Sequence, residues 1–282
     1  LGVDGFKTDG GEHAWGAELV YLDGSRGDEK NNAFPVAYAA AYGELLRSAG
    51  KAPVTFSRAG FTGSQAHGAF WAGDENSTWE AFAWSMNAGL SAASSGVVYW
   101  GWDIAGFSGE IPDAELYIRA VQASTFVPIM QYHSEFNHHR LPSRDRTPWN
   151  IAERTGDERV LPIVREFTHL RERLVPYLER EARVTIETDR PLMRPLFFDD
   201  SAYFDRAGET AGTQWMLGAD LLVAPVLQPH ADTVDVWLPE GEWVDVWTHE
   251  EVAGGRTVSV PTPLERIPVF ARAGAEVLAV FG

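Results

Sequence analysis

The sequence predicts an α/β protein in which a parallel sheet is followed by a small antiparallel β domain. Short apolar runs alternate with helical patterns up to about residue 187, which is typical of parallel strands joined by right-handed crossovers. From about residue 188, apolar and polar residues alternate between turns, which indicates hairpins. We therefore expect domains at residues 1–187 and 188–282. Both a doubly wound sheet and a (β/α) barrel fit this alternation. No Gly-rich phosphate loop follows a predicted strand, which weighs against a nucleotide-binding sheet.

The expected elements of the first domain follow from local patterns. Five short strands are expected at residues 2–8, 53–57, 69–72, 97–102 and 126–131. Four helices are expected at residues 35–49, 77–93, 113–123 and 158–183. Pro35 and Gly50 occupy the favoured first and stop positions of the first helix. Ser77 and Glu80 fit a capping box that would begin the second.

In the second domain, apolar residues recur at every second position, as is typical of β-strands. Strand candidates lie at residues 221–226, 234–238, 243–247 and 267–271. Val234, Val236 and Leu238 alternate with polar or amphipathic residues before a turn at residues 239–241, which is a hairpin signature.

Composition excludes several classes of function. The net charge is −17, with 40 acidic against 23 basic residues, so the surface would repel nucleic acid and anionic membranes. No apolar run approaches the roughly 18–20 residues that cross a bilayer. There are no cysteines, so disulfides and thiolate metal sites are excluded. The 11 Trp residues are open to two interpretations, aromatic core packing and platforms on which sugar rings stack.

Polar side chains follow the expected strands, at the point where each strand ends. They are Asp9, Arg58, Asp74, Asp103 and His133. In barrel enzymes the active site is built from the C-terminal ends of the strands and the loops that follow them. Five such residues in succession therefore predict one site at that end of the sheet.

Two aspartates among aromatic residues suggest glycoside hydrolysis. A retaining mechanism needs an ionised carboxylate and a protonated carboxyl about 5–5.5 Å apart. Lys7 and Arg58 would favour the ionised form of a neighbouring carboxylate. Asp74 follows Phe70 and Trp71, and we expect these apolar surroundings to raise its pKa, as the acid requires.

At these residues the chain resembles glycoside hydrolase family 31, the retaining α-glucosidases and α-xylosidases. The segment GFKTDGGE at residues 5–12 is similar to the nucleophile segment of the family's lysine-bearing bacterial branch, and FWAGD at 70–74 to its acid/base segment. Ser57 and Arg58, with Gly60 and Gln65, precede the latter as in the family. Further similar segments are WGWDIAGF at 100–107, MQYHS at 130–134, PLMRPL at 191–196 and GADLLVAP at 218–225.

The resemblance covers nearly the whole chain and implies a fold. The fold would be the later part, strands four to eight, of a (β/α)8 TIM barrel followed by an antiparallel β-sandwich domain. Family members carry an N-terminal β-sandwich and three earlier barrel strands that are not seen in these 282 residues. A five-strand remnant would leave an open sheet edge, so we expect the 282 residues alone to be inactive.

The resemblance also implies the role of each matching residue. Asp9 would be the nucleophile and Asp74 the acid/base. The side chains expected to hydrogen-bond the sugar are those of Arg58, Asp103 and His133. Lys7 and Glu12 would support the nucleophile, and the walls of the pocket would be Trp71, Trp100 and Phe107. Gly10 and Ala105 stand where many relatives have Phe and Gly, and these departures bear on sugar identity rather than on mechanism.

The expected function is hydrolysis of terminal α-linked sugars in oligosaccharides by double displacement, without a cofactor or a metal. α-Glucosides are the first candidate substrates, and α-xylosides the second. Transglycosylation, lyase chemistry and a catalytically incompetent carbohydrate-binding fragment are the alternatives. The cluster His133, Glu135, His138 and His139 lacks the spacing of a helical metal motif, so we expect no metal site there. Trp100 and Trp102 share one strand face, which either lines the pocket or packs on helices.

Overall fold

Five parallel strands form the sheet of the first domain. The computed structural model describes residues 2–135, 141–201, 203 and 213–282. In it the strands lie side by side in sequence order, as the alternation of strands and helices predicted. They are β1 (Phe6–Thr8), β2 (Thr55–Ser57), β3 (Ala69–Trp71), β4 (Trp100–Asp103) and β5 (Ile129–Gln131). All four ladders are parallel, so the carboxyl ends of the strands meet at one edge of the sheet.

Every strand of this sheet is shorter than or shifted from its prediction, for local physical reasons. Pro53 has no N–H to donate, and the expected strand 53–57 begins only at Thr55. The expected strand 126–131 begins at Ile129, because the guanidinium of Arg171 takes the carbonyls of residues 125, 127 and 128. The first expected strand, 2–8, is ordered as a strand only over Phe6–Thr8, where it pairs with β2.

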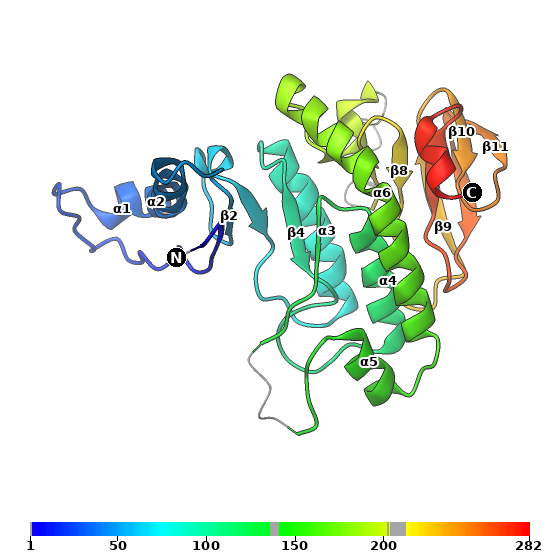
Figure 1. Ribbon diagram of the computed structural model, residues 1–282, viewed down its shortest axis with the longest axis horizontal. Coiled ribbons are helices and arrows are strands. Elements are labelled where there is room, and N and C mark those ends of the chain that lie inside the picture. The colour runs from blue at the N-terminus through cyan, green and yellow to red at the C-terminus, as the bar shows by residue number, and fades with distance from the viewer. Residues whose placement is uncertain (1, 136–140, 202, 204–212) are drawn as a thin grey trace.

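Helices connect the strands and cover one face of the sheet (Figure 1). The α-helices are α1 (Gly27–Lys30), α2 (Phe34–Ser48), α3 (Trp79–Ser94), α4 (Ala114–Thr125), α5 (Pro148–Thr155) and α6 (Val160–Thr188). Short 3-10 turns are η1 (Asn31–Ala33), η2 (Ser64–Ala66), η3 (Leu196–Phe198) and η5 (Glu276–Val280). Within the part of the chain that the structure describes, no helix is long and apolar enough to cross a bilayer.

The structure corrects two helix predictions and adds one helix. The N-cap of α3 is Thr78, whose hydroxyl accepts from the amide of Ala81 at 3.1 Å, and not Ser77. The Ser77 hydroxyl instead accepts from the Arg146 guanidinium. Helix α5, which was not predicted, follows the Thr147 cap. Helix α6 continues past residue 183 to Thr188.

The second domain is a two-layered antiparallel β structure, as predicted. Its strands are β6 (Met193–Arg194), β7 (Trp215–Leu217), β8 (Leu221–Val223), β9 (Thr233–Leu238), β10 (Glu242–Asp245), β11 (Glu251–Ala253), β12 (Arg256–Pro261) and β13 (Val269–Arg272). Six of them form one sheet in the order β11-β10-β13-β8-β7-β6, and β9 pairs with β12 in the second layer.

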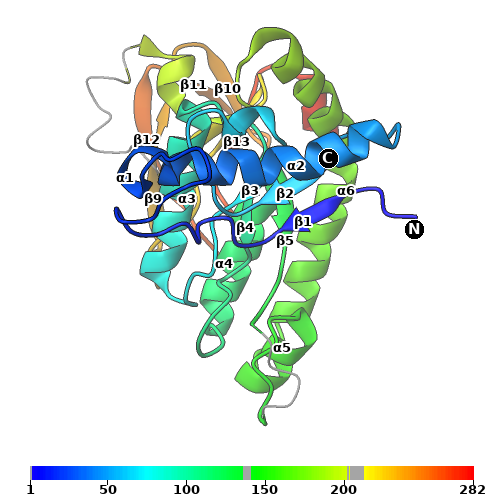
Figure 2. The same cartoon turned by 90° about the vertical axis from the view of Figure 1, so that its left-hand side faces the viewer.

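Alternation along the strands gives the six-stranded sheet two buried faces. Leu221 and Val223 of β8 join the cluster that includes α4 and α6, while Leu222 between them packs towards β9 and β12. Phe270 of β13 faces the same way as Leu222, and its neighbour Ala271 faces the helices. Helices α4 and α6 therefore lie between the five-stranded sheet and the six-stranded sheet. Figure 2, turned by 90°, shows β1 to β5 from the side of the N-terminal projection formed by α1 and α2.

Candidate active site

The strand ends bring together several of the polar residues singled out by the sequence. Asp9 follows β1 directly, and Arg58 follows β2 in the same way. Asp103 is the last residue of β4, and Asp74 lies three residues beyond β3. Because the strands are parallel, these side chains reach one edge of the sheet from four different strands.

Arg58 lies at the centre of the site. Its Nη1 is 3.2 Å from Oδ1 of Asp9 and 3.0 Å from Oδ2 of Asp74, and its Nη2 pairs with Glu12. Burial lowers the pKa of Arg58, but the bond to Glu12 and the charges of the two aspartates outweigh burial and raise it above its ordinary value. A single cation thus holds three carboxylates around one point.

The backbone of Asp9 is fixed by helix α2. The hydroxyl of Tyr38 donates to the Asp9 carbonyl at 2.7 Å, and the amide of Gly10 donates to Asp9 Oδ1 at 2.8 Å. Gly11 has a φ of +89°, and a Cβ there would come within 2.8 Å of the Tyr38 ring. Glycine is therefore required for the close approach of the turn to α2. Tyr38 was missed by the sequence analysis, because nothing in a helical tyrosine 29 residues away signals this contact.

Asp103 is the most buried carboxylate of the site. Its Oδ1 accepts from Nε2 of Gln131 at 2.9 Å, while its Oδ2 is buried and has no hydrogen-bond partner among the described residues. Burial, with the charges of Asp74 and Asp9, raises the pKa of Asp103 to about 6, against the lowering effects of Lys7 and Gln131. The free oxygen is an acceptor that a ligand hydroxyl would satisfy. Gln131 was missed by the sequence analysis.

Lys7 and Trp71 lie on the same face of the sheet as Asp103. The ammonium of Lys7 is 4.4 Å from the centroid of the Trp71 ring, a cation–π contact. The indole Nε1 of Trp71 is buried and has no hydrogen-bond partner in the part of the chain that the structure describes. An unpaired donor therefore lies on the same face of the sheet as the unpaired acceptor of Asp103.

His133 and Phe107 approach from the loops after β5 and β4. Their ring centroids are 5.1 Å apart, with the planes tilted by 57°. Burial, together with the charge of Lys7, lowers the pKa of His133, and the charges of Asp74 and Asp9 oppose this. The imidazole is therefore neutral at neutral pH, so it both donates and accepts.

Two predictions for this site are corrected. Trp100 was expected to wall the pocket, but its ring lies against α3, where a Cβ on Gly89 would come within 2.6 Å of it. Trp102 likewise stacks on Phe82 of α3, at 5.1 Å between ring centroids. Both indoles lie on the helix side of β4, opposite to Asp103. Of the two readings left open for this strand face, packing on helices is the right one.

The surroundings expected for Asp74 also differ. Its side chain is 43% exposed and faces Arg58 rather than apolar side chains. The reason is the turn after β3, where Gly73 has a φ of +101° and separates Asp74 from the buried Trp71.

No metal cluster is found among the described residues, which leave out His138 and His139. Glu135 lies near Arg144, at 3.9 Å between Oε1 and Nη1.

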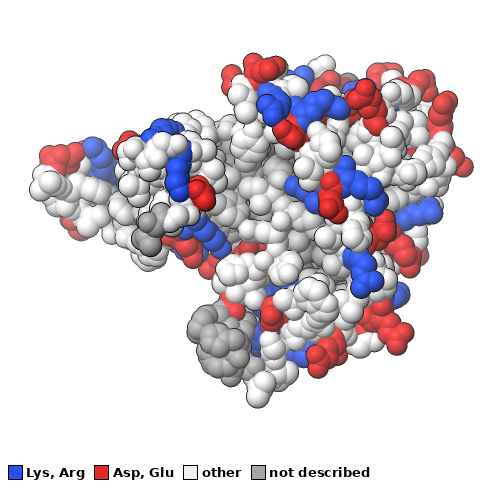
Figure 3. Space-filling model, in the orientation of Figure 1, with Lys and Arg blue, Asp and Glu red and all other residues white. Residues whose placement is uncertain are grey.

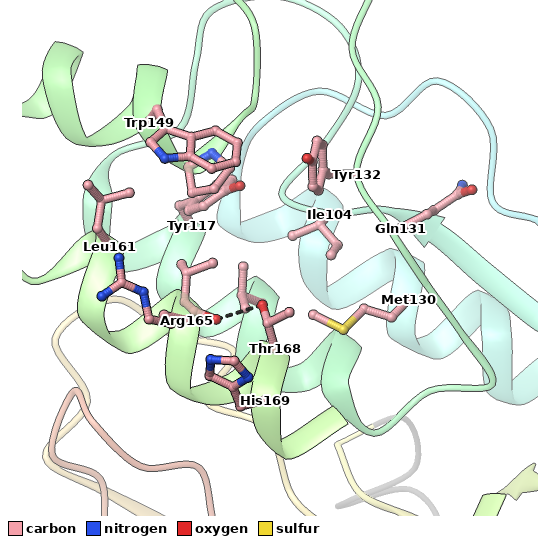
Figure 4. A pocket seen from close by; sticks show the side chains of 13 residues that line it. Ile104, Tyr117, Met130, Gln131, Tyr132, Trp149, Leu161, Arg165, Thr168 and His169 are labelled. Carbon is pink, nitrogen blue, oxygen red and sulfur yellow. Dashed lines mark hydrogen bonds between the residues drawn. The ribbon is translucent and has the colours of Figure 1, made fainter. Parts of the chain in front are cut away.

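Two other surface features lie apart from the site. A cavity of about 500 Å³ that opens to the surface lies between α4, α5, α6 and β5 (Figure 4), and its lining includes Tyr117, Met130 and Trp149 but no carboxylate. On the face seen in Figure 3, Lys and Arg atoms are interspersed with Asp and Glu atoms rather than gathered in one patch.

Comparison with known proteins supplies the relatives of this chain. The model of the glycosyl hydrolases family 31 TIM-barrel domain matches residues 1–180, and that of the glycosyl hydrolase family 31 C-terminal domain matches residues 189–277. The 1,3-alpha-isomaltosidase of Kribbella flavida is 66% identical over 96% of this chain and 37% of its own length. The isomaltosyltransferase of Sporosarcina globispora is 42% identical over 98% of this chain and 25% of its own length.

A solved structure is similar throughout. The cycloalternan-degrading enzyme from Trueperella pyogenes, in complex with a covalent intermediate, matches 97% of this chain with a TM-score of 0.91 and 57% identity. The match covers 37% of that protein. The chain thus spans little more than a third of the Kribbella flavida and Trueperella pyogenes proteins and a quarter of the Sporosarcina globispora protein.

Proposed function

The chain belongs to glycoside hydrolase family 31, and on that premise we propose that it supplies the catalytic carboxylates of a retaining α-glycosidase. Asp9 is the nucleophile and Asp74 the acid/base. The likeness to a Trueperella pyogenes enzyme solved with a covalent intermediate supports a double displacement.

The observation that carries the proposal is the Arg58 bridge. Nη1 of Arg58 lies 3.2 Å from an Asp9 oxygen and 3.0 Å from an Asp74 oxygen. The distance between these two oxygens therefore cannot exceed the sum of the two values. In inverting enzymes the two carboxyl groups stand about 6.5–9.5 Å apart to leave room for a water molecule. Here one guanidinium nitrogen bridges the near oxygens of both carboxylates, which favours the shorter separation of retaining enzymes. The pair of carboxylates therefore fits a retaining site.

The residues divide the chemistry between them. An oxygen of Asp9 attacks the anomeric carbon as Asp74 gives its proton to the glycosidic oxygen, and the bond to the leaving group breaks. Water then attacks the glycosyl ester, gives its proton to Asp74, and releases Asp9 as a carboxylate. Arg58 stabilises the ionised Asp9 before and after the cycle. The free Oδ2 of Asp103 and the neutral imidazole of His133 accept and donate hydrogen bonds to sugar hydroxyls.

For the substrate we propose an α-linked isomaltosyl unit, a subset of the expected α-glucosides. The support is the 66% identity to a relative named 1,3-alpha-isomaltosidase. The departure at Gly10 fits a modified pocket, because a Cβ there would come within 2.8 Å of the His13 ring. His13 thus fills the space beside the nucleophile that a phenylalanine would need.

Replacement of the nucleophile tests the proposal. In the full-length protein that carries this chain, Asp9→Ala should lower kcat by roughly 10⁴-fold or more, because no covalent intermediate can form. Azide should restore turnover of an activated α-glycoside and give the β-glycosyl azide. Asp4→Ala is the matched control, since Asp4 is exposed and pairs with Lys51. Unchanged activity in Asp9→Ala, or an α-configured azide product, would remove the nucleophile assignment.

Substrate identity needs a separate measurement. Hydrolysis rates should be compared for isomaltosyl, glucosyl and xylosyl α-glycosides with the same leaving group. We expect the isomaltosyl substrate to have the highest kcat/KM. A higher kcat/KM for the xyloside would contradict the proposed substrate but not the proposed mechanism.

A further inference from the structure

Arg146 is a fully buried arginine that no step of the proposed mechanism uses. It lies between β5 and α5, and none of its side chain reaches the surface. Its Nε and Nη2 donate to the Ser77 hydroxyl at 3.3 and 3.1 Å. Nη2 also donates to the Ser108 carbonyl at 2.8 Å, and Nη1 to the Arg144 carbonyl at 2.8 Å. The guanidinium therefore touches three separate segments.

Two of these segments carry site residues. Ser77 closes the short segment that begins with Asp74, and Ser108 follows Phe107, whose ring contacts His133. The two segments are also joined directly, since the amides of residues 107 and 108 donate to the Glu75 carbonyl at 2.7 and 2.9 Å. Gly106 lies so close that a Cβ on it would come within 2.7 Å of the Asn76 backbone.

The chemistry of the guanidinium explains why an arginine stands here. Both segments are irregular, so their carbonyls have no complete ladder or helix to satisfy them, and a buried carbonyl without a donor is costly. Arginine offers five N–H donors in a fixed plane and accepts nothing. A lysine ammonium has three donors on a flexible stem and cannot hold the same set of oxygens.

We propose that Arg146 is a positioning residue for the acid/base Asp74: by holding Ser77 and the loop after β4, it fixes the segment from which Asp74 reaches the glycosidic oxygen. This inference rests on the proposed function. It places Arg146 outside the chemistry, acting through the segment at residues 74–78.

Dependence on the leaving group distinguishes positioning of an acid from general support of the fold. A sugar leaving group needs the proton, whereas fluoride or a dinitrophenolate leaves without much assistance. In Arg146→Met, kcat/KM for an oligosaccharide should fall about 100-fold, the cost expected from a displacement near 1 Å. With a glycosyl fluoride it should fall less than about threefold, since the general acid contributes little to that reaction.

Arg119 provides the matched control. It is equally buried, and it donates to the carbonyls of Pro263 at 3.1 Å and Arg266 at 2.7 Å, which join α4 to the second domain. Arg119→Met should destabilise the protein in a similar way but lower the rates of both substrates by one common factor. If Arg146→Met does not fold, Ser77→Ala removes only one acceptor and should lower oligosaccharide hydrolysis about fivefold, the value of one ordinary hydrogen bond.

Asp74→Ala, measured beside these variants, separates the two hypotheses. If Asp74→Ala shows no selective loss on poor leaving groups, the acid/base assignment itself fails. If Asp74→Ala shows that loss, but Arg146→Met and Ser77→Ala lower both substrates equally, as Arg119→Met does, only the role of Arg146 is overturned. A selective loss in Arg146→Met, with Arg119→Met uniform, supports the positioning role.

Discussion

Buried polar groups are treated differently in the two domains. In the second domain the indole of Trp215 donates to the Phe126 carbonyl at 3.0 Å, and that of Trp243 to the Pro239 carbonyl at 2.8 Å. At the strand ends of the first domain, Glu12 Oε2, Trp71 Nε1 and Asp103 Oδ2 are buried with no hydrogen-bond partner among the residues that the structure describes.

The difference indicates that the strand ends of the first domain are less stable than they could be, because polar atoms there are left unpaired for a ligand. An unpaired buried donor or acceptor costs about 1–3 kcal/mol, so natural structures keep few of them. Six such atoms are found among the described residues, all of them in the first domain. Those of Glu12, Trp71 and Asp103 lie at the strand ends, where a ligand rich in hydroxyls would satisfy them, and the other three belong to His67, Ser85 and Arg119. Mutations in the second domain should therefore act on stability alone, and mutations at the strand ends should act on activity as well.

Trp243→Ala should give the largest effect on stability. The ring is completely buried and lies under the Arg272 guanidinium, 4.6 Å from the ring centroid. We expect a loss of about 3–5 kcal/mol in the free energy of unfolding, as for other buried Trp truncations. The activity per folded molecule should stay unchanged. Denaturant unfolding and kcat, measured on the same preparation, check both parts.

The control for Trp243→Ala is Trp84→Ala. Trp84 lies on α3 and is 66% exposed, so its removal should change stability by less than about 0.5 kcal/mol. Equal losses in the two variants would mean that the second domain does not hold the stability assigned to it.

Asp103→Asn should act in opposite directions on stability and activity. The pKa of Asp103 is raised to about 6 from an ordinary 3.8, so the unfolded chain gives up this proton at a lower pH than the folded protein. The free energy of unfolding of the native protein should thus fall as pH rises from about 4 to about 6, by roughly 3 kcal/mol at most.

The asparagine variant removes that loss because it cannot ionise. At pH 7 it should therefore be more stable than the native protein by about 2 kcal/mol, with the two unfolding curves converging below about pH 4. Its kcat/KM should fall roughly 10- to 100-fold, the value of a hydrogen bond to a charged group. Urea unfolding at several pH values tests the first part, and a variant that is less stable at pH 7 would show that burial of this charge is not costly.

The arrangement of strands and helices could be predicted from the sequence more fully than the contacts between side chains. Period and turn residues were enough for the parallel sheet, the antiparallel domain and the strand-end position of Asp9 and Asp103. They were not enough for β4, because a strand buried on both faces has no apolar–polar alternation to say which face is inner. Trp100 and Trp102 were therefore ambiguous until the packing on α3 settled them.

Contacts between distant segments were beyond the sequence. Tyr38 reaches Asp9 across 29 positions, and Gln131 reaches Asp103 across 28, so neither leaves a local pattern. Arg146 has the same property on a larger scale, since it is 69 positions from Ser77. The misplaced cap of α3 has this origin: Ser77 looks like a cap locally, but Arg146 occupies its hydroxyl.

Thr78→Ala should have the smallest effect. It tests whether the backbone hydrogen bonds at the start of α3, next to Asp74, are as complete as those of the second domain. The Thr78 hydroxyl accepts from the Ala81 amide at 3.1 Å, so its loss should cost about 1 kcal/mol of stability and expose that amide to exchange. Thr78→Ser should keep both. Ser77→Ala should leave the exchange of the Ala81 amide as it is, because Ser77 bonds Arg146 instead. Faster Ala81 exchange in Ser77→Ala than in Thr78→Ala would show that Ser77 is the N-cap. The Ser77 hydroxyl would then not be bonded to Arg146, and Arg146 would not be linked to the Asp74 segment.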